Sequence, residues 1–180
     1  MTAPLSVARS ELVLGGQKSG KSRRAELLAA AWLAASPQHR GVMLATATPW
    51  DDEMRARIAE HQARRDARWR TVAAQLDLPA ALAGAGPALV DCLTLWLTNL
   101  MLGGHDVAAA TTALESALAA RLAPTVLVAN EVGLGIVPDT KLGRAFRDAA
   151  GVLNQRIAAR ADHVHFIAAG LPLLLKGKLP

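Results

Sequence analysis

A glycine-rich octapeptide near the amino terminus constrains this chain more than any other stretch. Residues 15–22 read Gly-Gly-Gln-Lys-Ser-Gly-Lys-Ser and match the pattern G-x-x-x-x-G-K-S. The apolar run 12–14 precedes them, and a long alanine- and leucine-rich stretch follows. A strand, a glycine loop and a helix in this order direct backbone N–H groups and the positive end of a helix at one anion. We therefore expect a P-loop that binds a nucleoside triphosphate.

Two side chains of the motif and one distant carboxylate have predicted roles. Lys21 would reach the β- and γ-phosphates, and the Ser22 hydroxyl would ligate Mg²⁺. Asp91 ends the apolar run 88–91, where a carboxylate would orient Mg²⁺ or its bound water. The predicted nucleotide-binding positions are Gly15, Gly16, Gln17, Lys18, Ser19, Gly20, Lys21, Ser22 and Asp91, and the predicted metal ligands are Ser22 and Asp91.

Strand and helix patterns alternate along the chain. Strands are expected over 11–14, 41–45, 68–72, 88–91, 125–129 and 163–168. Helices are expected over 21–35, 51–65, 78–82, 93–102, 107–122 and 139–160, and residues 171–180 are expected to form a tail. This alternation predicts an α/β fold in which helices cover both faces of a mostly parallel sheet. A length of 180 residues without an evident linker or repeat predicts a single domain over 1–180.

Composition restricts the partners and the compartment. No apolar run approaches the roughly 20 residues that a membrane span needs, so we expect no membrane span. The single cysteine excludes an internal disulfide and indicates a cytoplasmic protein. The net charge is +5, but the chain has no Tyr and only two Phe, so bases would have few aromatic platforms on which to stack. The charge therefore favours a phosphate-rich small substrate over nucleic acid.

Histidines offer two patterns, and only one suggests chemistry. His163 and His165 alternate on an expected strand, with no carboxylate or cysteine close in sequence, so we interpret them as partly buried structural residues. His61 lies on the expected second helix, with Arg57, Arg64, Arg65 and Arg68 near it in sequence. Such cations would bind phosphate and lower the imidazole pKa, which leaves a neutral nucleophile able to attack the α-phosphorus of a nucleotide.

Seven motifs spread along the chain point to one family. They are Gly15-Gly16-x-x-Ser19-Gly20-Lys21-Ser22, Ala45-Thr46, Asp51-Asp52-Glu53-Met54-x-x-Arg57-Ile58-x-x-His61, Arg65-x-x-x-Trp69-x-Thr71, Thr98-Asn99, Asn130-Glu131-Val132-Gly133-x-Gly135-Ile136-Val137-Pro138 and Phe146-Arg147-Asp148-x-x-Gly151-x-x-Asn154-Gln155. The blocks around His61 and Asn130 are far more specific than the P-loop. With these motifs the chain, from about residue 13 to 170, resembles the bifunctional adenosylcobinamide kinase/adenosylcobinamide-phosphate guanylyltransferase family of cobalamin biosynthesis.

The resemblance implies two reactions on one P-loop (RecA-like) fold. Adenosylcobinamide would be phosphorylated by a nucleoside triphosphate, ATP or GTP, with Mg²⁺. GMP from GTP would then be transferred to adenosylcobinamide phosphate through a GMP-histidine, which makes His61 and Lys21 the expected catalytic residues. The family typically forms a homotrimer. By position, the guanine nucleotide would be bordered by Thr46, Ala47, Thr48, Gln62, Ala63, Arg64 and Arg65.

Two other functions remain open on the sequence. The family often carries an acidic residue two positions after the threonine of its Trp-x-Thr motif, where this chain has Ala73. If that carboxylate reads guanine, its replacement is consistent with an enzyme that keeps only the kinase activity. The P-loop and positive charge also permit a RecA-type nucleic-acid ATPase or nucleotide-gated module, but such a module would not need the histidine block.

Overall fold

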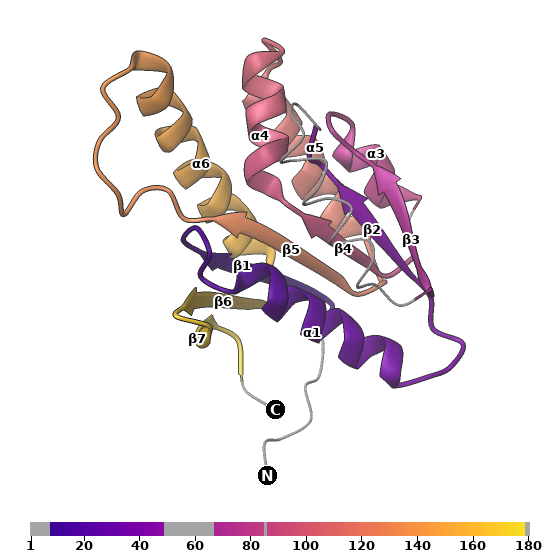
Figure 1. Ribbon diagram of the computed structural model, residues 1–180. Helices are drawn as coiled ribbons and strands as arrows, with labels where there is room; N and C mark the ends of the chain where they lie inside the picture. Colours follow the sequence, from indigo (N-terminus) through magenta and orange to yellow (C-terminus); the bar gives the residue numbers. More distant parts are fainter. Residues whose placement is uncertain (1–7, 49–66, 85, 179–180) are drawn as a thin grey trace.

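The computed structural model describes residues 8–48, 67–84 and 86–178 (Figure 1). All but the last of its twelve described elements lie where the sequence patterns predict a strand or a helix. In chain order they are β1 (Ser10–Gly15), α1 (Lys21–Ala34), β2 (Gly41–Ala45), β3 (Trp69–Ala73), α3 (Leu78–Ala83), β4 (Ala88–Asp91), α4 (Leu93–Leu102), α5 (Val107–Ala120), β5 (Thr125–Asn130), α6 (Lys141–Arg160), β6 (His163–Ala168) and β7 (Leu171–Lys176). The helix expected over 51–65 lies outside the described residues.

All seven strands form one sheet in the order β3-β2-β4-β5-β1-β6-β7. Every neighbouring pair is parallel except β6 and β7. The predicted α/β fold is therefore confirmed, because parallel neighbours need the crossover helices that the alternation supplies. The P-loop follows β1 and Asp91 ends β4, so both lie at the carboxyl ends of the parallel strands. Since β5 lies between β1 and β4, they are two strands apart.

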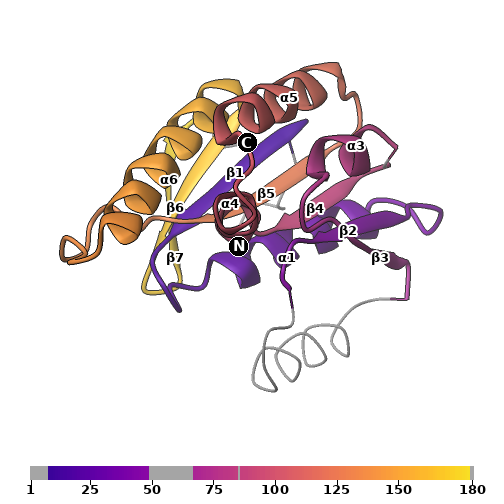
Figure 2. The ribbon, with the colours of Figure 1, turned by 90° about the horizontal axis from the view of Figure 1, so that it is seen from above.

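Helices cover both faces of this sheet (Figure 2). Alternate residues of β1 point to opposite faces, so Leu12 and Leu14 belong to one buried cluster and Val13 to another. The larger cluster includes apolar side chains of α3, α4, α5 and α6, and Trp96 of α4 is fully buried within it. The smaller cluster includes Ala25, Leu28 and Ala29 of α1. Burial on both faces explains why the central strands read as continuous apolar runs.

The prediction of a tail after residue 170 was wrong, because residues 171–176 form β7. Ala168 and Leu171 are partners in the antiparallel ladder with β6, so only two residues turn the chain. Both turn residues, Ala169 and Gly170, have positive φ (51° and 80°), as two-residue hairpins of the favoured hand require. Pro172 is tolerated because β7 is an edge strand.

None of the helices in the described ranges is long and apolar enough to cross a lipid bilayer.

Candidate active site

The P-loop backbone is tightly packed at two of its glycines. A Cβ on Gly15 would come within 2.4 Å of Ser19 Oγ and 2.7 Å of the Ile167 carbonyl oxygen. Gly20 has φ +101°, and a Cβ there would lie 3.1 Å from Gly170 Cα. The Gly170 N–H also donates a 2.8 Å hydrogen bond to the Ser19 carbonyl. The loop is thus held against the β6–β7 hairpin, and two of its glycines are required for conformational or steric reasons.

Lys21 and Ser22 lie in the first turn of α1, where the sequence predicted them. Lys21 is 8% exposed, and its Nζ donates a 3.1 Å hydrogen bond to the Gly16 carbonyl. Gly20 occupies the N-cap position, and no side chain caps the start of α1 within the described ranges. A helix start without a side-chain cap, next to a lysine, presents N–H donors and positive charge to an anion.

Ser19 gives a second indication that the loop binds a polar ligand. Its Oγ is buried and has no hydrogen-bond partner among the residues that the structure describes. Buried hydroxyls are nearly always hydrogen-bonded in native proteins. A phosphate oxygen bound in the loop would supply the acceptor.

Thr46, predicted to border the nucleotide, connects the ends of β2 and β4 through its side chain. Its Oγ1 donates to the Cys92 carbonyl at 2.7 Å and accepts from the Cys92 N–H at 2.8 Å. Asn99 donates from Nδ2 to the carbonyls of Thr46, at 2.8 Å, and Gln75, at 3.0 Å. Thr46 is fully buried, so its side chain positions the backbone that leads to the half-buried Ala47 and Thr48.

Asp91, half-buried, ends β4 on the same edge of the sheet as the P-loop. Together with Ser22 it provides carboxylate and hydroxyl oxygens, the ligand type that Mg²⁺ prefers. Its neighbour Cys92 is buried, and this burial, followed by the negative charge of Asp91, raises the pKa of the thiol to about 11. Cys92 is therefore a neutral thiol at neutral pH and is unsuited to be a nucleophile.

The sequence patterns did not reveal the hydrogen bonds that fix the carboxyl end of β5. Thr94 Oγ1 accepts the Asn130 N–H at 2.7 Å, and Asn154 Nδ2 donates to the Asn130 carbonyl at 3.2 Å. Glu131 Oε1 accepts from the Gly133 N–H at 2.6 Å. Thr94 could have been noticed as a polar residue inside the apolar start of α4, at 9% exposure. Its hydroxyl position, however, follows only from the packing of α4 against β5.

The remaining predicted site residues fall in a part of the chain that the structure does not describe. Their positions relative to the P-loop stay predictions. They are His61, Gln62, Ala63, Arg64 and Arg65.

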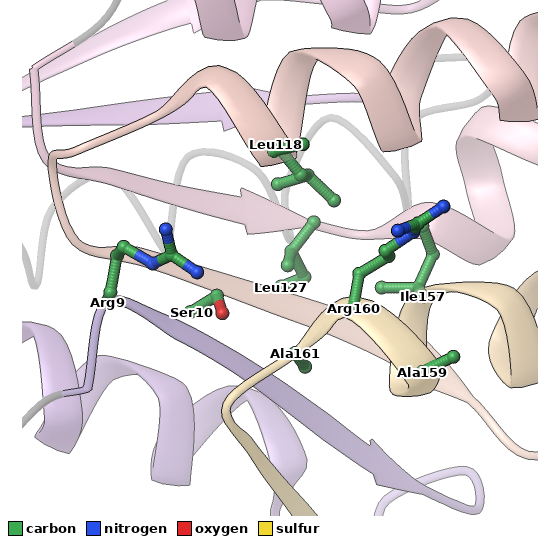
Figure 3. A pocket seen from close by; sticks show the side chains of 9 residues that line it. Arg9, Ser10, Leu118, Leu127, Ile157, Ala159, Arg160 and Ala161 are labelled. Atoms are coloured by element: carbon green, nitrogen blue, oxygen red, sulfur yellow. The ribbon is translucent and has the colours of Figure 1, made fainter.

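A cavity of about 260 Å³ lies near the amino-terminal end of β1, between this strand and the carboxyl ends of α5 and α6 (Figure 3). None of the predicted site residues that the structure describes lines it. Its residues are Arg9, Ser10, Leu118, Ala119, Leu127, Ile157, Ala159, Arg160 and Ala161. Because it lies far along the strands from the P-loop, it is separate from the candidate nucleotide site.

Comparison with known proteins adds a family. The family model described as "Cobinamide kinase / cobinamide phosphate guanyltransferase" matches residues 11–175. The Pseudomonas aeruginosa "Bifunctional adenosylcobalamin biosynthesis protein CobP" is 48% identical, and the alignment covers 93% of this chain and 98% of that protein. The Salmonella typhimurium "Bifunctional adenosylcobalamin biosynthesis protein CobU" is 41% identical, with 92% and 98% covered.

Solved structures show the same fold at low sequence identity. The flagellar accessory protein FlaH from Methanocaldococcus jannaschii has a TM-score of 0.55 at 11% identity, over 96% of this chain and 80% of that one. A Pyrococcus horikoshii protein, PH0250, has a TM-score of 0.51 at 11% identity, over 98% and 90%. At this identity the likeness concerns the fold alone.

Proposed function

This chain belongs to the cobinamide kinase / cobinamide phosphate guanyltransferase family, and we propose that its guanylyl transfer passes through a GMP adduct on His61. The chain is a bifunctional enzyme of cobalamin biosynthesis. It phosphorylates adenosylcobinamide with a nucleoside triphosphate and then transfers GMP from GTP to give adenosylcobinamide-GDP. The family match over residues 11–175, with the P-loop at the carboxyl edge of the sheet, carries this assignment.

In the kinase step, the chain contributes mainly position and charge. Lys21 leaves the Gly16 carbonyl and binds the β- and γ-phosphates, while loop N–H groups and Ser19 Oγ bind their oxygens. Mg²⁺ held by Ser22 and Asp91 would neutralise the charge that develops between these phosphates. The packing at Gly15 and Gly20 keeps the loop in one conformation, so little reorganisation is needed when the nucleotide binds.

In the transferase step, the same loop holds the leaving group. A neutral His61 nitrogen attacks the α-phosphorus of GTP, a P–N bond forms, and the bond to the β-phosphate oxygen breaks to release pyrophosphate. A phosphate oxygen of adenosylcobinamide phosphate then attacks the same phosphorus, and the P–N bond breaks to restore the imidazole. The arginines near His61 in sequence support this role, because they would bind the phosphates beside it.

Two segments are proposed to border the guanine nucleotide. Thr46 acts by holding Ala47 and Thr48 in place through its contacts with Cys92 and Asn99. The second segment, residues 62–65, follows the proposed catalytic histidine in sequence.

Labelling with GTP that carries radioactive α-phosphate tests the GMP-histidine. We expect wild type and a His105→Asn control to retain label that is stable to alkali and labile to acid, and His61→Asn to retain none. His105 is an exposed histidine between α4 and α5, so it controls for nonspecific labelling. His61→Asn should still phosphorylate adenosylcobinamide. Wild type that takes up no label would contradict the adduct and favour a kinase-only enzyme.

We further propose a cytoplasmic homotrimer. The single cysteine is buried as a free thiol, which is compatible with a reducing compartment. Two groups of exposed apolar side chains support self-association: Ile136 is 97% exposed in the loop after β5, and Leu173 is 59% exposed on the edge strand β7. Exposed apolar groups of this kind mark protein interfaces. The other members of the two groups are Leu134, Val137, Leu142, Leu171 and Leu175.

A further inference from the structure

The amino-terminal halves of β1 and β6, far from the P-loop, bring together the side chains of Glu11, His163 and His165. The ladder between β1 and β6 pairs Glu11 with His163 and Val13 with His165, so the three side chains share one face. This is the face covered by α1, because Val13 packs in the same cluster as Ala25 of that helix. The interpretation of His163 and His165 from sequence missed the carboxylate, which β1 supplies 154 residues before His165 in the chain.

The three side chains point their donor atoms at one another. Glu11 Oε2 lies 2.8 Å from His165 Nε2, and Glu11 Oε1 lies 3.7 Å from His163 Nδ1. One ligand atom from each residue lies within 4.8 Å of the other two. The imidazole rings are nearly perpendicular, at 85°, with centroids 6.2 Å apart, so they approach the carboxylate from different directions. This convergence leaves the three donors around a common point.

Burial makes this arrangement costly without a cation. The Glu11 side chain is fully buried and that of His165 is 5% exposed. A buried carboxylate needs a paired charge, several hydrogen bonds or a metal. Glu11 has the His165 contact and a 2.8 Å hydrogen bond from the Ala8 N–H. That backbone contact would also orient Glu11 as a ligand, as outer contacts commonly do at metal sites.

We propose that Glu11, His163 and His165 form a binding site for a divalent transition-metal ion, with Zn²⁺ as the ion they suit best. Two imidazole nitrogens and one carboxylate oxygen are a common zinc ligand set. Bonds of about 2.0–2.1 Å place tetrahedral ligand atoms about 3.3 Å apart, and the 2.8 Å and 3.7 Å separations lie on either side of that distance. The His163 side chain is 21% exposed, which gives the ion a path from solvent.

The site would stabilise the sheet around the two chain ends. A Cβ on Gly177, just past β7, would lie 2.1 Å from His163 Cδ2, so the end of the last strand lies against this imidazole. An ion bound here joins β1 to β6 and fixes the histidine that supports β7. Since the unfolded chain separates these ligands, the ion binds the folded state and the melting temperature rises with its concentration.

Calorimetric titration of the chelator-treated full-length chain with Zn²⁺ alone, without nucleotide or Mg²⁺, tests the site. We expect one ion per chain for wild type and at least tenfold weaker binding for Glu11→Gln, His163→Asn and His165→Asn. The control variant His105→Asn keeps full affinity, since His105 lies between α4 and α5 and outside the cluster. Zn²⁺ also raises the melting temperature of wild type and of this control, but not that of the three cluster variants.

His163→Asn keeps the test decisive, because His163 is partly exposed and its replacement disturbs the core least. If this variant has the wild-type circular dichroism spectrum and binds Zn²⁺ as tightly as wild type, the proposal is wrong. A wild-type chain that binds no Zn²⁺, or one whose binding is lost in His105→Asn, would equally overturn it. In each of these cases the cluster is a hydrogen-bonded Glu11–His165 pair only. Because no nucleotide is present, failure here leaves the proposed enzyme function untouched.

Discussion

Gly15 and Gly16 are adjacent in the P-loop but have different surroundings. A Cβ on Gly15 would collide with the Ser19 side chain and with the Ile167 carbonyl, whereas no atom of the described residues lies within 4 Å of the equivalent point on Gly16. The two positions therefore separate the steric requirement of the fold from the needs of phosphate binding.

Gly15→Ala is expected to destabilise the nucleotide-free chain by about 1–3 kcal/mol, because a backbone carbonyl must move. The matched variant Gly16→Ala should unfold as wild type does. Thermal unfolding without nucleotide measures the difference, expected to be several degrees. Equal melting temperatures for the two variants would show that the loop relaxes around the new methyl group.

Cys92 predicts a dependence of stability on alkaline pH. Burial raises its pKa from 9.0 to about 11, so the unfolded chain loses this proton first as the pH rises. The stability that the protonated Cys92 thiol contributes to the folded state is fully present below pH 9.0 and is lost as the pH rises to about 11. The free energy of unfolding falls by roughly 2–3 kcal/mol over this window. Urea unfolding of wild type and Cys92→Ala across this window checks it. Parallel pH profiles for the two chains would contradict the raised pKa.

Arg121 joins elements that are distant along the chain. Its buried guanidinium donates from Nε to Thr125 Oγ1 at 2.7 Å, from one terminal nitrogen to the Leu82 carbonyl, and from the other to the Gly86 carbonyl. It thus connects the end of α5 to α3, to the segment between α3 and β4, and to the start of β5. Burial lowers its pKa from the ordinary arginine value, but the guanidinium keeps its positive charge.

Arg121→Met should cost about 2–4 kcal/mol of folding free energy, because carbonyl groups in a buried region lose their donors. The control Arg160→Met removes an exposed guanidinium whose Nε is 3.6 Å from Glu115, and it should cost under about 1 kcal/mol. Urea denaturation gives both values. Similar midpoints for the two variants would mean that water replaces the Arg121 hydrogen bonds.

At the scale of the whole molecule, the exposed apolar side chains predict how the proposed trimer forms. Replacing Leu173 or Ile136 by Asp should break the assembly, because a charge would be buried in the interface. Leu122→Asp is the matched control, since Leu122 is 88% exposed outside both groups. Light scattering after size exclusion should give three times 18.9 kDa for wild type and the control, and less for the two variants. A monomeric wild type would contradict the trimer.

The strand order limited what local patterns could predict. The spacing of apolar residues predicted every described helix and strand except β7. The β6–β7 hairpin depends on positive φ at Ala169 and Gly170. The insertion of β5 between β1 and β4 has no local signature. As a result, the sequence placed Asp91 on the correct edge but could not give its distance from the P-loop.

The sequence by itself determined the P-loop, the alternation of strands and helices, and the family. Each motif and each periodic pattern behind these predictions depends on residues close together in the chain. Only the tertiary structure decided which distant side chains meet. It showed that the Thr46 side chain forms hydrogen bonds with the Cys92 backbone, and that Glu11 lies beside His163 and His165. These contacts are set by which strands pair and in which register, and pairing between distant strands leaves no periodicity in the sequence.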